Sequence, residues 1–362
     1  MKLFKCQACA QLLYFENRRC ERCTRRLGYL PDQFALSALE QRGEEWFALA
    51  SPGADFRFCT NAAHDACNWL VPTSSTEPFC AACRHNRTIP PLDQEENLLA
   101  WRKLELAKHR LFYALQRLDL PLTTRQEDPE RGLAFDFLVS PLDNASAKVV
   151  TGHHNGLITI AAEETDDAAR ERLRQQMGET YRTTLGHLRH EVGHYYWTRL
   201  VEDAEAMLAP FRACFGDERA DYGQALQTYY ANGPPPDWQY RFVSAYASAH
   251  PWEDFAETWA HYLHIVDTLE TACAFGLQIA PSIQAATPLE ARLDFDPYRA
   301  ADIERLVDAW LPLTFAVNSL NRSMGQPDLY PFVLSRPAIE KLSFVHALIR
   351  GRPSARKGGA DA

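Results

Sequence analysis

The segment HLRHEVGHYYW, residues 187–197, decides the fold of the larger part of the chain. It lies within a longer stretch, residues 180–201, whose apolar positions predict a helix. His190 and His194 are four residues apart, so on that helix both imidazoles lie on one face, about one turn apart. The pattern His-Glu-x-x-His on a helix allows two ring nitrogens to bind one metal ion. We therefore predict a metal site at residues 190–194.

Glu191 lies on the neighbouring face of the same helix, too far round to be a third ligand. It is close enough to hold a water molecule bound to the metal, so it is the candidate general base. The alternative interpretation is a solvated polar face on a surface helix. Apolar neighbours argue against that alternative, because they would bury the histidines without a partner; they are Leu185, Leu188, Val192, Tyr195, Tyr196 and Trp197.

A second helix follows about 60 residues later, in the segment SAYASAHPWEDFAETWAHYLHIVDTLE, residues 244–270. The segment begins in a loop, and Pro251 is placed at the helix start. Glu253 and Glu257 are four residues apart and share one face of this helix. One carboxylate can bind the metal while the other accepts the free N–H of a ligand histidine. The alternative is an exposed acidic helix face, which would not need so many aromatic neighbours.

At these residues the chain resembles a known group of enzymes. The HExxH helix followed by a helix with ExxxE resembles the gluzincin metallopeptidases, and YASAHPWEDFAE, residues 246–257, is similar to their third-ligand segment. The motifs LRHEVGHYYW and PWEDFAETWAHYLH, together with a cysteine-rich N-terminus, resemble more closely the bacterial putative zinc-binding metallopeptidase family. This resemblance covers nearly the whole chain.

The resemblance implies an α+β fold, with a zincin-like metallopeptidase domain that is mostly helical and has a small sheet. It implies that His190, His194 and Glu253 bind one catalytic zinc ion. A different rotation of the second helix would put Glu257 or Asp254 in the place of Glu253. The family itself implies no particular substrate.

The resemblance also implies the mechanism. Glu191 would take a proton from a zinc-activated water that attacks a peptide carbonyl, and would pass it to the leaving amine. Tyr246 would donate its hydroxyl to the developing oxyanion, and Glu257 would hold a ligand histidine. We therefore expect a zinc metallopeptidase that acts on a peptide or protein substrate. The alternatives are a zinc-ribbon adaptor with an inactive peptidase-like scaffold and a nucleic-acid-dependent protease.

Eight of the ten cysteines lie in the first 83 residues. The first four form two CxxC pairs, and two such turns make the tetrahedral sulfur cage that zinc favours; they are Cys6, Cys9, Cys20 and Cys23. The second four are less regular, because seven residues separate the first pair, where a CxxC pair has two; they are Cys59, Cys67, Cys80 and Cys83. We predict two structural zinc sites. His64 or His85 is an alternative ligand in the second, although each fits a surface loop better.

The rest of the chain suggests a domain order. We predict a zinc-ribbon region over residues 1–90, the metallopeptidase domain over 91–350 and a disordered basic tail over 351–362. The segment FALSALEQRGEEWFALA, residues 34–50, is predicted to form a short helix and turn, and a long helix follows Pro91. GLITI, residues 156–160, is predicted to be the strand that pairs with an extended substrate.

Charge is distributed unevenly along the chain. Residues 1–30 contain seven Lys or Arg and two Glu, a net charge of +5. Because the formal net charge of the whole chain is −9, the remainder has a net charge of −14. A basic ribbon attached to an acidic domain suggests contact with nucleic acid or with an acidic protein through the ribbon. No apolar run approaches 18 residues and no signal peptide is recognisable, so we expect no membrane contact and a cytoplasmic location.

Overall fold

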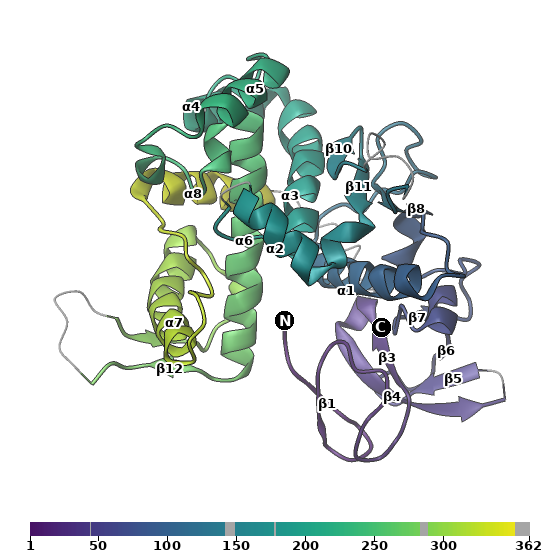
Figure 1. Ribbon diagram of the computed structural model, residues 1–362. Helices are drawn as coiled ribbons and strands as arrows, with labels where there is room; N and C mark the ends of the chain where they lie inside the picture. The colour runs from purple at the N-terminus through teal and green to yellow at the C-terminus, as the bar shows by residue number, and fades with distance from the viewer. Residues whose placement is uncertain (44, 142–148, 177–178, 283–288, 352–362) are drawn as a thin grey trace. The chain divides into compact units, whose positions relative to one another are not determined.

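A computed structural model describes residues 1–43, 45–141, 149–176, 179–282 and 289–351 (Figure 1). The chain forms two compact units. The first comprises Met1–Tyr113, Leu122–Gln175 and Thr183–Leu188, and the second comprises Ala114–Pro121, Gln176–Arg182 and Arg189–Ala362. The predicted tail, residues 351–362, falls almost wholly outside the described residues, and the predicted domain boundaries stay a prediction.

The first unit contains three sheets. A two-stranded sheet pairs β1 (Phe4–Lys5) with β2 (Leu12–Leu13). A five-stranded antiparallel sheet follows the chain order and consists of β3 (Leu27–Leu30), β4 (Ala35–Arg42), β5 (Glu45–Ala48), β6 (Asp55–Phe58) and β7 (Leu70–Pro72). A four-stranded sheet has the order β10 (Gly152–His154), β11 (Leu157–Ala161), β9 (Ala134–Leu138) and β8 (Asn86–Thr88). Its helices are α1 (Glu95–Arg117), which ends in the second unit, and α2 (Asp167–Gln176).

The prediction of a short helix at residues 34–50 is wrong. These residues form β4 and β5, which pair antiparallel with Leu39 opposite Ala48. The apolar side chains of this stretch pack into the core of the five-stranded sheet with Leu30, Phe56 and Leu70. Pairing with residues distant in the chain decides the structure here, and a local apolar pattern does not contain that information.

The prediction for residues 156–160 is also wrong in one respect. They form a strand, β11, but it lies between β10 and β9, so both of its edges are already paired. Asn155 and Gly156 both have positive φ angles, 47° and 78°, and form the two-residue turn of the β10–β11 hairpin. Asn-Gly is the preferred sequence for such a turn.

Helix α1 supplies much of the core of the first unit. Trp101, Leu104, Leu111 and Phe112 are fully buried on it. Its Tyr113 lies 5.5 Å from Phe15, ring centroid to ring centroid. Phe15 and Tyr29 (4.8 Å), and Tyr29 and Trp69 (4.8 Å), extend this aromatic cluster into the ribbon strands. Aromatic packing of this kind compensates for the small apolar core of a cysteine-rich segment.

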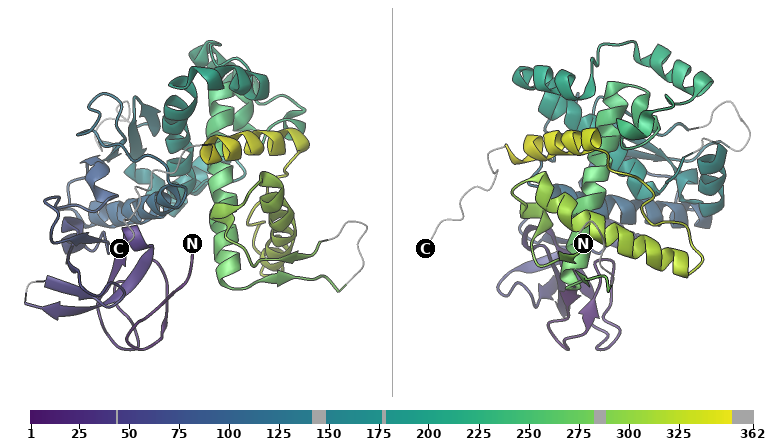
Figure 2. Two further views of the ribbon diagram at one scale, coloured as in Figure 1. Left: turned by 180° about the vertical axis from the view of Figure 1, so that it is seen from behind. Right: turned by 90° about the vertical axis from the view of Figure 1, so that its left-hand side faces the viewer.

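The second unit is mostly helical. It contains α3 (Thr184–Trp197) from Arg189 onward, α4 (Glu205–Phe215), α5 (Tyr222–Asn232), α6 (Pro251–Ala274), α7 (Ile303–Ser323) and α8 (Arg336–Arg350), with a small sheet of β12 (Gln278–Ile279) and β13 (Ala291–Arg292). Figure 2 shows that α7 runs beside α6 and that α8 crosses it. The predicted helices at residues 180–201 and after Pro251 are both present, and the predicted α+β class is confirmed. Among the described residues, no helix combines the length and apolar composition needed to span a membrane.

Candidate active site and metal centres

Helices α3 and α6 approach each other closely at Gly193. A Cβ atom at this position would lie 3.0 Å from the Ala256 Cα and 3.2 Å from the Trp259 Cβ, so glycine permits the contact. One turn further along α3, the Tyr196 ring stacks on the Trp259 ring at 4.9 Å with an angle of 20° between the planes. The close approach brings the histidines of α3 next to the acidic first turn of α6.

Three side chains converge at this crossing. The Nε2 atoms of His190 and His194 lie 3.2 Å apart, and the Glu253 Oε2 lies 3.0 Å from the first and 3.6 Å from the second. All three residues are largely buried, and Glu253 is only 1% exposed. Glu253 lies in the first turn of α6, where the helix dipole favours a negative charge.

The arrangement fits a zinc ion. A tetrahedral zinc with nitrogen and oxygen ligands at 2.0–2.1 Å requires its ligand atoms to be about 3.3 Å apart. The three observed separations, 3.0, 3.2 and 3.6 Å, bracket this value. Three protein ligands are also the number found in catalytic zinc sites, where the fourth position serves the reaction.

Glu257 holds the first of these histidines. Its Oε1 lies 2.7 Å from the His190 Nδ1, and its Oε2 accepts a hydrogen bond of 2.6 Å from the Ser244 hydroxyl. Burial alone would raise the pKa of Glu257, but the hydrogen bond and charge of His190 lower it to about 2. A carboxylate that accepts the Nδ1–H leaves the Nε2 lone pair of His190 directed at the metal position.

The three carboxylates considered as the third ligand differ in their positions relative to the two imidazoles. Glu253 is the carboxylate beside both Nε2 atoms, and Glu257 contacts the opposite nitrogen of His190. Asp254 points elsewhere, because its Oδ2 lies 2.6 Å from the Lys341 ammonium in a buried ion pair. Of the three candidates, Glu253 is the one whose carboxylate could share a metal ion with both imidazoles.

Two tyrosines border the site. Tyr246, in the short 3-10 helix Tyr246–Ser248, has its ring 5.9 Å from the His190 ring. Tyr222, the first residue of α5, donates a hydrogen bond of 2.6 Å to the Glu253 Oε1. Burial and the charge of Glu253 raise the pKa of both hydroxyls far above the usual value, so both remain protonated donors. Nothing in the sequence spacing pointed to Tyr222 or to Ser244.

Glu191 is the neighbour in sequence of the first site histidine. It is 8% exposed and follows His190 on α3. After burial and Glu253, the charge of Glu191 is a further cause that raises the pKa of Tyr222. The structure brings His190, His194, Glu253 and Glu257 together, with the Tyr246 ring beside His190, and the catalytic roles of Glu191 and Tyr246 stay predictions.

The remaining histidines of these helices have other partners. His187 pairs with Glu164 at 3.3 Å in the first unit. His261 lies 2.6 Å from the Tyr330 hydroxyl, and His264 lies 2.5 Å from the Arg189 guanidinium. None of the three belongs to the group of His190, His194 and Glu253 among the described residues.

The first cysteine cluster has the geometry of a zinc cage. The Sγ atoms of Cys6 and Cys23 lie 3.7 Å apart, and those of Cys9 and Cys20 lie 3.5 Å apart. A tetrahedral zinc with four sulfurs at 2.3 Å requires about 3.8 Å. All four thiols lie within 4.8 Å of one another, so this donor set fits zinc.

The second cluster contains four buried cysteines and a histidine that was not predicted. The thiols of Cys59, Cys67, Cys80 and Cys83 lie within 4.8 Å of one another. His109 of α1 lies beside them, with its Nε2 3.3 Å from the Cys67 Sγ. A histidine within a long amphipathic helix shows no ligand spacing in the sequence, so this neighbour was missed.

The two histidines suggested as alternative ligands in the second cluster lie apart from it. His64 is an exposed residue whose ring lies 5.8 Å from the Trp101 ring. The expectation of a surface position is wrong for His85, which is 2% exposed and donates a hydrogen bond of 2.8 Å to the Leu133 carbonyl.

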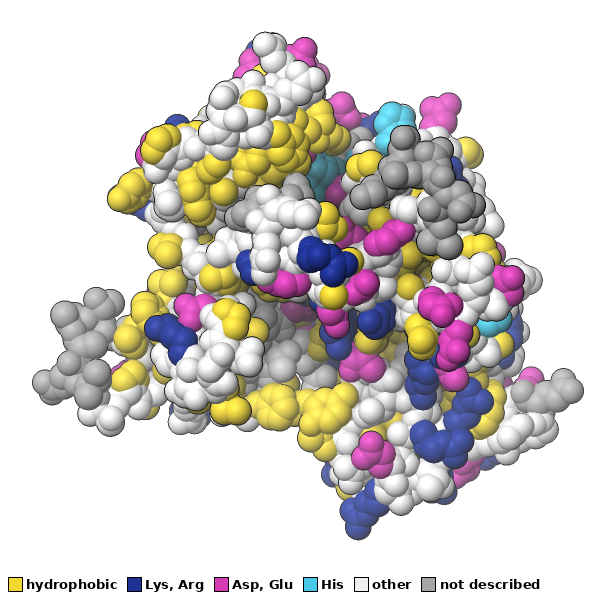
Figure 3. Space-filling view, in the orientation of Figure 1, with side chains coloured by type: hydrophobic (Ala, Val, Ile, Leu, Met, Phe, Trp, Pro, Cys, Tyr) yellow, Lys and Arg dark blue, Asp and Glu magenta, His cyan; other side chains and the backbone are white. Residues whose placement is uncertain are grey.

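The basic side chains of the ribbon are partly paired within the ribbon. Arg25 lies 3.5 Å from Glu40, Arg18 lies 3.4 Å from Asp65, and Arg26 stacks over the Phe58 ring at 4.3 Å. Figure 3 nevertheless shows several Lys and Arg side chains together over the five-stranded sheet. Contact of this face with nucleic acid or an acidic protein stays a prediction.

Similarity to known proteins agrees with the site. Residues 97–348 match the family described as "Putative zinc-binding metallo-peptidase", and residues 3–94 match a zinc-ribbon domain, so the resemblance inferred from the motifs is confirmed. The chain is similar to uncharacterized proteins of Mycobacterium bovis and Mycobacterium tuberculosis, with 42% identity over 349 residues, which cover 96% of this chain and 95% of each relative. No solved structure matches the chain significantly.

Proposed function

The chain belongs to the family of putative zinc-binding metallopeptidases, and from this premise we propose that it hydrolyses peptide bonds in a peptide or protein substrate. The observation that carries the proposal is the convergence of His190 Nε2, His194 Nε2 and Glu253 Oε2 within 3.0–3.6 Å of one another. Two histidines from HExxH and a glutamate from a later helix are the ligand set of gluzincins, so we assign the site to that class.

A bound zinc ion supplies Lewis acidity, which polarises a substrate carbonyl and lowers the pKa of water. Glu191 takes the proton from the attacking water and delivers it to the leaving amine. The hydroxyl of Tyr246 donates to the oxygen on which negative charge develops. Glu257 keeps the His190 ring oriented through its Nδ1, and Tyr222 keeps the Glu253 carboxylate oriented through its Oε1.

The two cysteine clusters have a different part in this proposal. Each offers at least four ligand atoms, which closes the coordination sphere and leaves no position for a reaction. We assign them two structural zinc ions, for a total of three per chain. Closely spaced cysteines that bind metal are typical of a reducing compartment, which supports a cytoplasmic location.

Cleavage profiling tests the proposed activity. The purified wild-type protein is incubated with a proteome-derived peptide library, in parallel with Glu191→Gln and with a surface control, Glu340→Gln. We expect new peptide termini with the wild type and the control, and none with Glu191→Gln, while all three proteins retain three zinc ions. Identical termini from all three would overturn the proposal. A wild type that binds zinc at the histidines and generates no termini would instead favour the adaptor.

A further inference from the structure

The second cysteine cluster offers five ligand atoms where a tetrahedral zinc needs four. Beside its four thiols lies the imidazole of His109, which is 4% exposed and also groups with Cys83 and Glu105. The His109 Nε2 lies 3.3 Å from the Cys67 Sγ, 3.6 Å from the Cys83 Sγ and 3.9 Å from the Cys80 Sγ. Among the described residues, Cys59 is the thiol of this cluster with which His109 makes no such contact.

The protonation of His109 is fixed by its other nitrogen. The Nδ1 lies 2.6 Å from the backbone carbonyl of Glu105, one turn earlier on α1. A carbonyl oxygen can only accept, so Nδ1 carries the hydrogen and the Nε2 lone pair faces the thiols. This is the arrangement of a metal-binding histidine, whose second nitrogen is held by a carbonyl or a carboxylate.

The distances match a site with three sulfurs and one nitrogen. With zinc–sulfur bonds of 2.3 Å and a zinc–nitrogen bond of about 2.05 Å, a tetrahedron requires sulfur and nitrogen to be about 3.6 Å apart. The three observed separations, 3.3, 3.6 and 3.9 Å, are centred on this value. The sulfur–sulfur distance between Cys67 and Cys80 is 3.8 Å, as the same tetrahedron requires.

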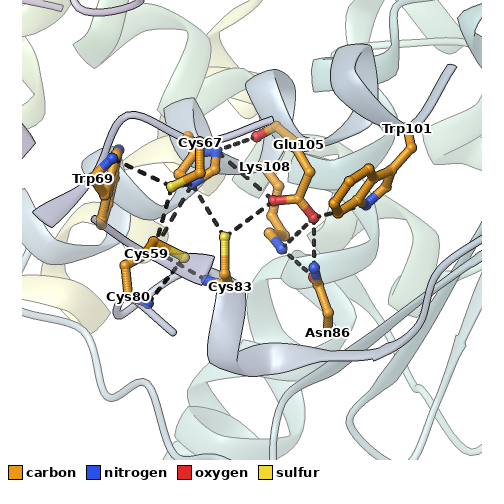
Figure 4. Close-up of polar contacts among 10 residues, drawn as sticks. Cys59, Cys67, Trp69, Cys80, Cys83, Asn86, Trp101, Glu105 and Lys108 are labelled. Carbon is orange, nitrogen blue, oxygen red and sulfur yellow. Dashed lines mark hydrogen bonds and ion pairs between the residues drawn. The ribbon is translucent and has the colours of Figure 1, made fainter. Parts of the chain in front are cut away.

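The buried charges around the cluster favour the same ligand set. Figure 4 shows Glu105, Lys108 and Asn86 beside Cys83, and the Glu105 carboxylate pairs with the Lys108 ammonium at 2.9 Å. Both side chains are fully buried and their charges offset each other. A zinc ion with four thiolates would add a net charge of −2 to this interior, whereas three thiolates and a neutral imidazole add −1. Burying the smaller uncompensated charge costs less free energy.

We propose that Cys67, Cys80, Cys83 and His109 bind the second structural zinc ion, and that Cys59 remains an uncoordinated thiol. The three cysteines belong to the part of the chain that matches the zinc ribbon, residues 3–94, whereas His109 belongs to the part that matches the peptidase family, residues 97–348. The second zinc is then a cross-link between the ribbon and α1, and not a centre internal to the ribbon.

Cadmium-113 NMR of the full-length protein tests this ligand set. Each bound ion gives its own resonance, and the shift moves upfield when a nitrogen replaces a sulfur ligand. We expect one four-sulfur resonance from the first cluster and one three-sulfur, one-nitrogen resonance from the second. In protein labelled with 15N-histidine, the second resonance should be split by coupling to one nitrogen. Two unsplit four-sulfur resonances would overturn the proposal.

Two variants make the assignment independent of the wild-type spectrum. Cys59→Ser should keep the split resonance and three metal ions per chain, whereas His109→Ala should lose that resonance and bind two. The opposite result, in which Cys59→Ser loses the resonance of the second cluster and His109→Ala retains it, would also overturn the proposal. If His109→Ala does not fold, the Cys59→Ser spectrum alone decides. The resonance of the His190 and His194 site is separate, so failure of the proposed peptidase site would leave this test intact.

Discussion

The Nδ1 atom of His190 lies 2.7 Å from the Oε1 of Glu257, across the contact between α3 and α6. This one hydrogen bond fixes which nitrogen of His190 can face Glu253 and His194. It also links His190 on α3 to α6, the helix that carries Glu253. Zinc affinity should therefore depend on a residue that does not itself bind the metal.

Replacing Glu257 by alanine removes this support. We expect Glu257→Ala to lower the zinc affinity of the catalytic site by about 10- to 100-fold, because the His190 ring loses its fixed orientation. Competition with a graded series of chelators measures the affinity. Glu340→Ala, at an exposed position on α8, is the matched control and should have no effect. Equal affinity in Glu257→Ala and the wild type would show that the hydrogen bond is dispensable.

Replacing Gly193 by alanine tests the close approach of the two helices. The new Cβ would lie 3.0 Å from the Ala256 Cα, so α3 and α6 must move apart. We expect Gly193→Ala to lower the free energy of unfolding by about 1–3 kcal/mol. Gly223→Ala in α5 is the control, because its Cβ would meet only the Asp221 carboxylate at 3.6 Å. Urea unfolding of both variants should separate them, and equal stabilities would refute the steric argument.

The two tyrosines should differ in what their hydroxyls do. We expect Tyr246→Phe to lower kcat by about 10²- to 10³-fold with zinc retained, because it removes a donor to the oxyanion. Tyr222→Phe should instead weaken zinc binding, because its hydroxyl holds the Glu253 Oε1. Kinetics on a peptide substrate, combined with metal analysis, distinguishes the two. If Tyr222→Phe, and not Tyr246→Phe, lowered kcat while zinc was retained, Tyr222 would be the oxyanion donor.

The buried His85 should make the protein sensitive to acid. Burial lowers its pKa from 6.5 to about 4, so the unfolded chain binds a proton that the folded chain does not. The neutral ring therefore stabilises the fold fully above pH 6.5, and this contribution is lost as the pH falls from 6.5 through 4. The loss amounts to roughly 3 kcal/mol. Unfolding free energies of the wild type and His85→Gln, measured between pH 7 and pH 4.5, should converge at low pH. Equal pH dependences of the unfolding free energy in the two proteins would contradict the attribution of this acid sensitivity to His85.

Part of the candidate site was predictable from the sequence because helical periodicity brings its residues together in pairs, whereas the roles of Glu253 and Tyr246 were implied by the family resemblance. His190 and His194 share a helix face at a spacing of four, and so do Glu253 and Glu257, so only the meeting of two helices had to be supplied by the fold. Gly193 permits that meeting, but a lone glycine in a helix does not identify its neighbour.

The residues that the sequence did not indicate come to the candidate sites from segments distant in the chain. Tyr222 reaches Glu253 from α5, and His109 reaches Cys67 from α1, and neither spacing follows a local rule. The strands at residues 35–42 and 45–48 were mistaken for a helix for the same reason, since β4 and β5 are stabilised by pairing within a sheet and not by local propensity. The Asn155-Gly156 turn was a local signal that the sequence did contain.

Anomalous diffraction at the zinc absorption edge, from crystals of the wild-type protein, tests the central claim most directly. The two cysteine clusters serve as internal controls for metal loading. The account predicts a third peak about 2.0–2.2 Å from the His190 Nε2, the His194 Nε2 and a Glu253 carboxylate oxygen. Peaks at both cysteine clusters, with none between α3 and α6, would contradict it.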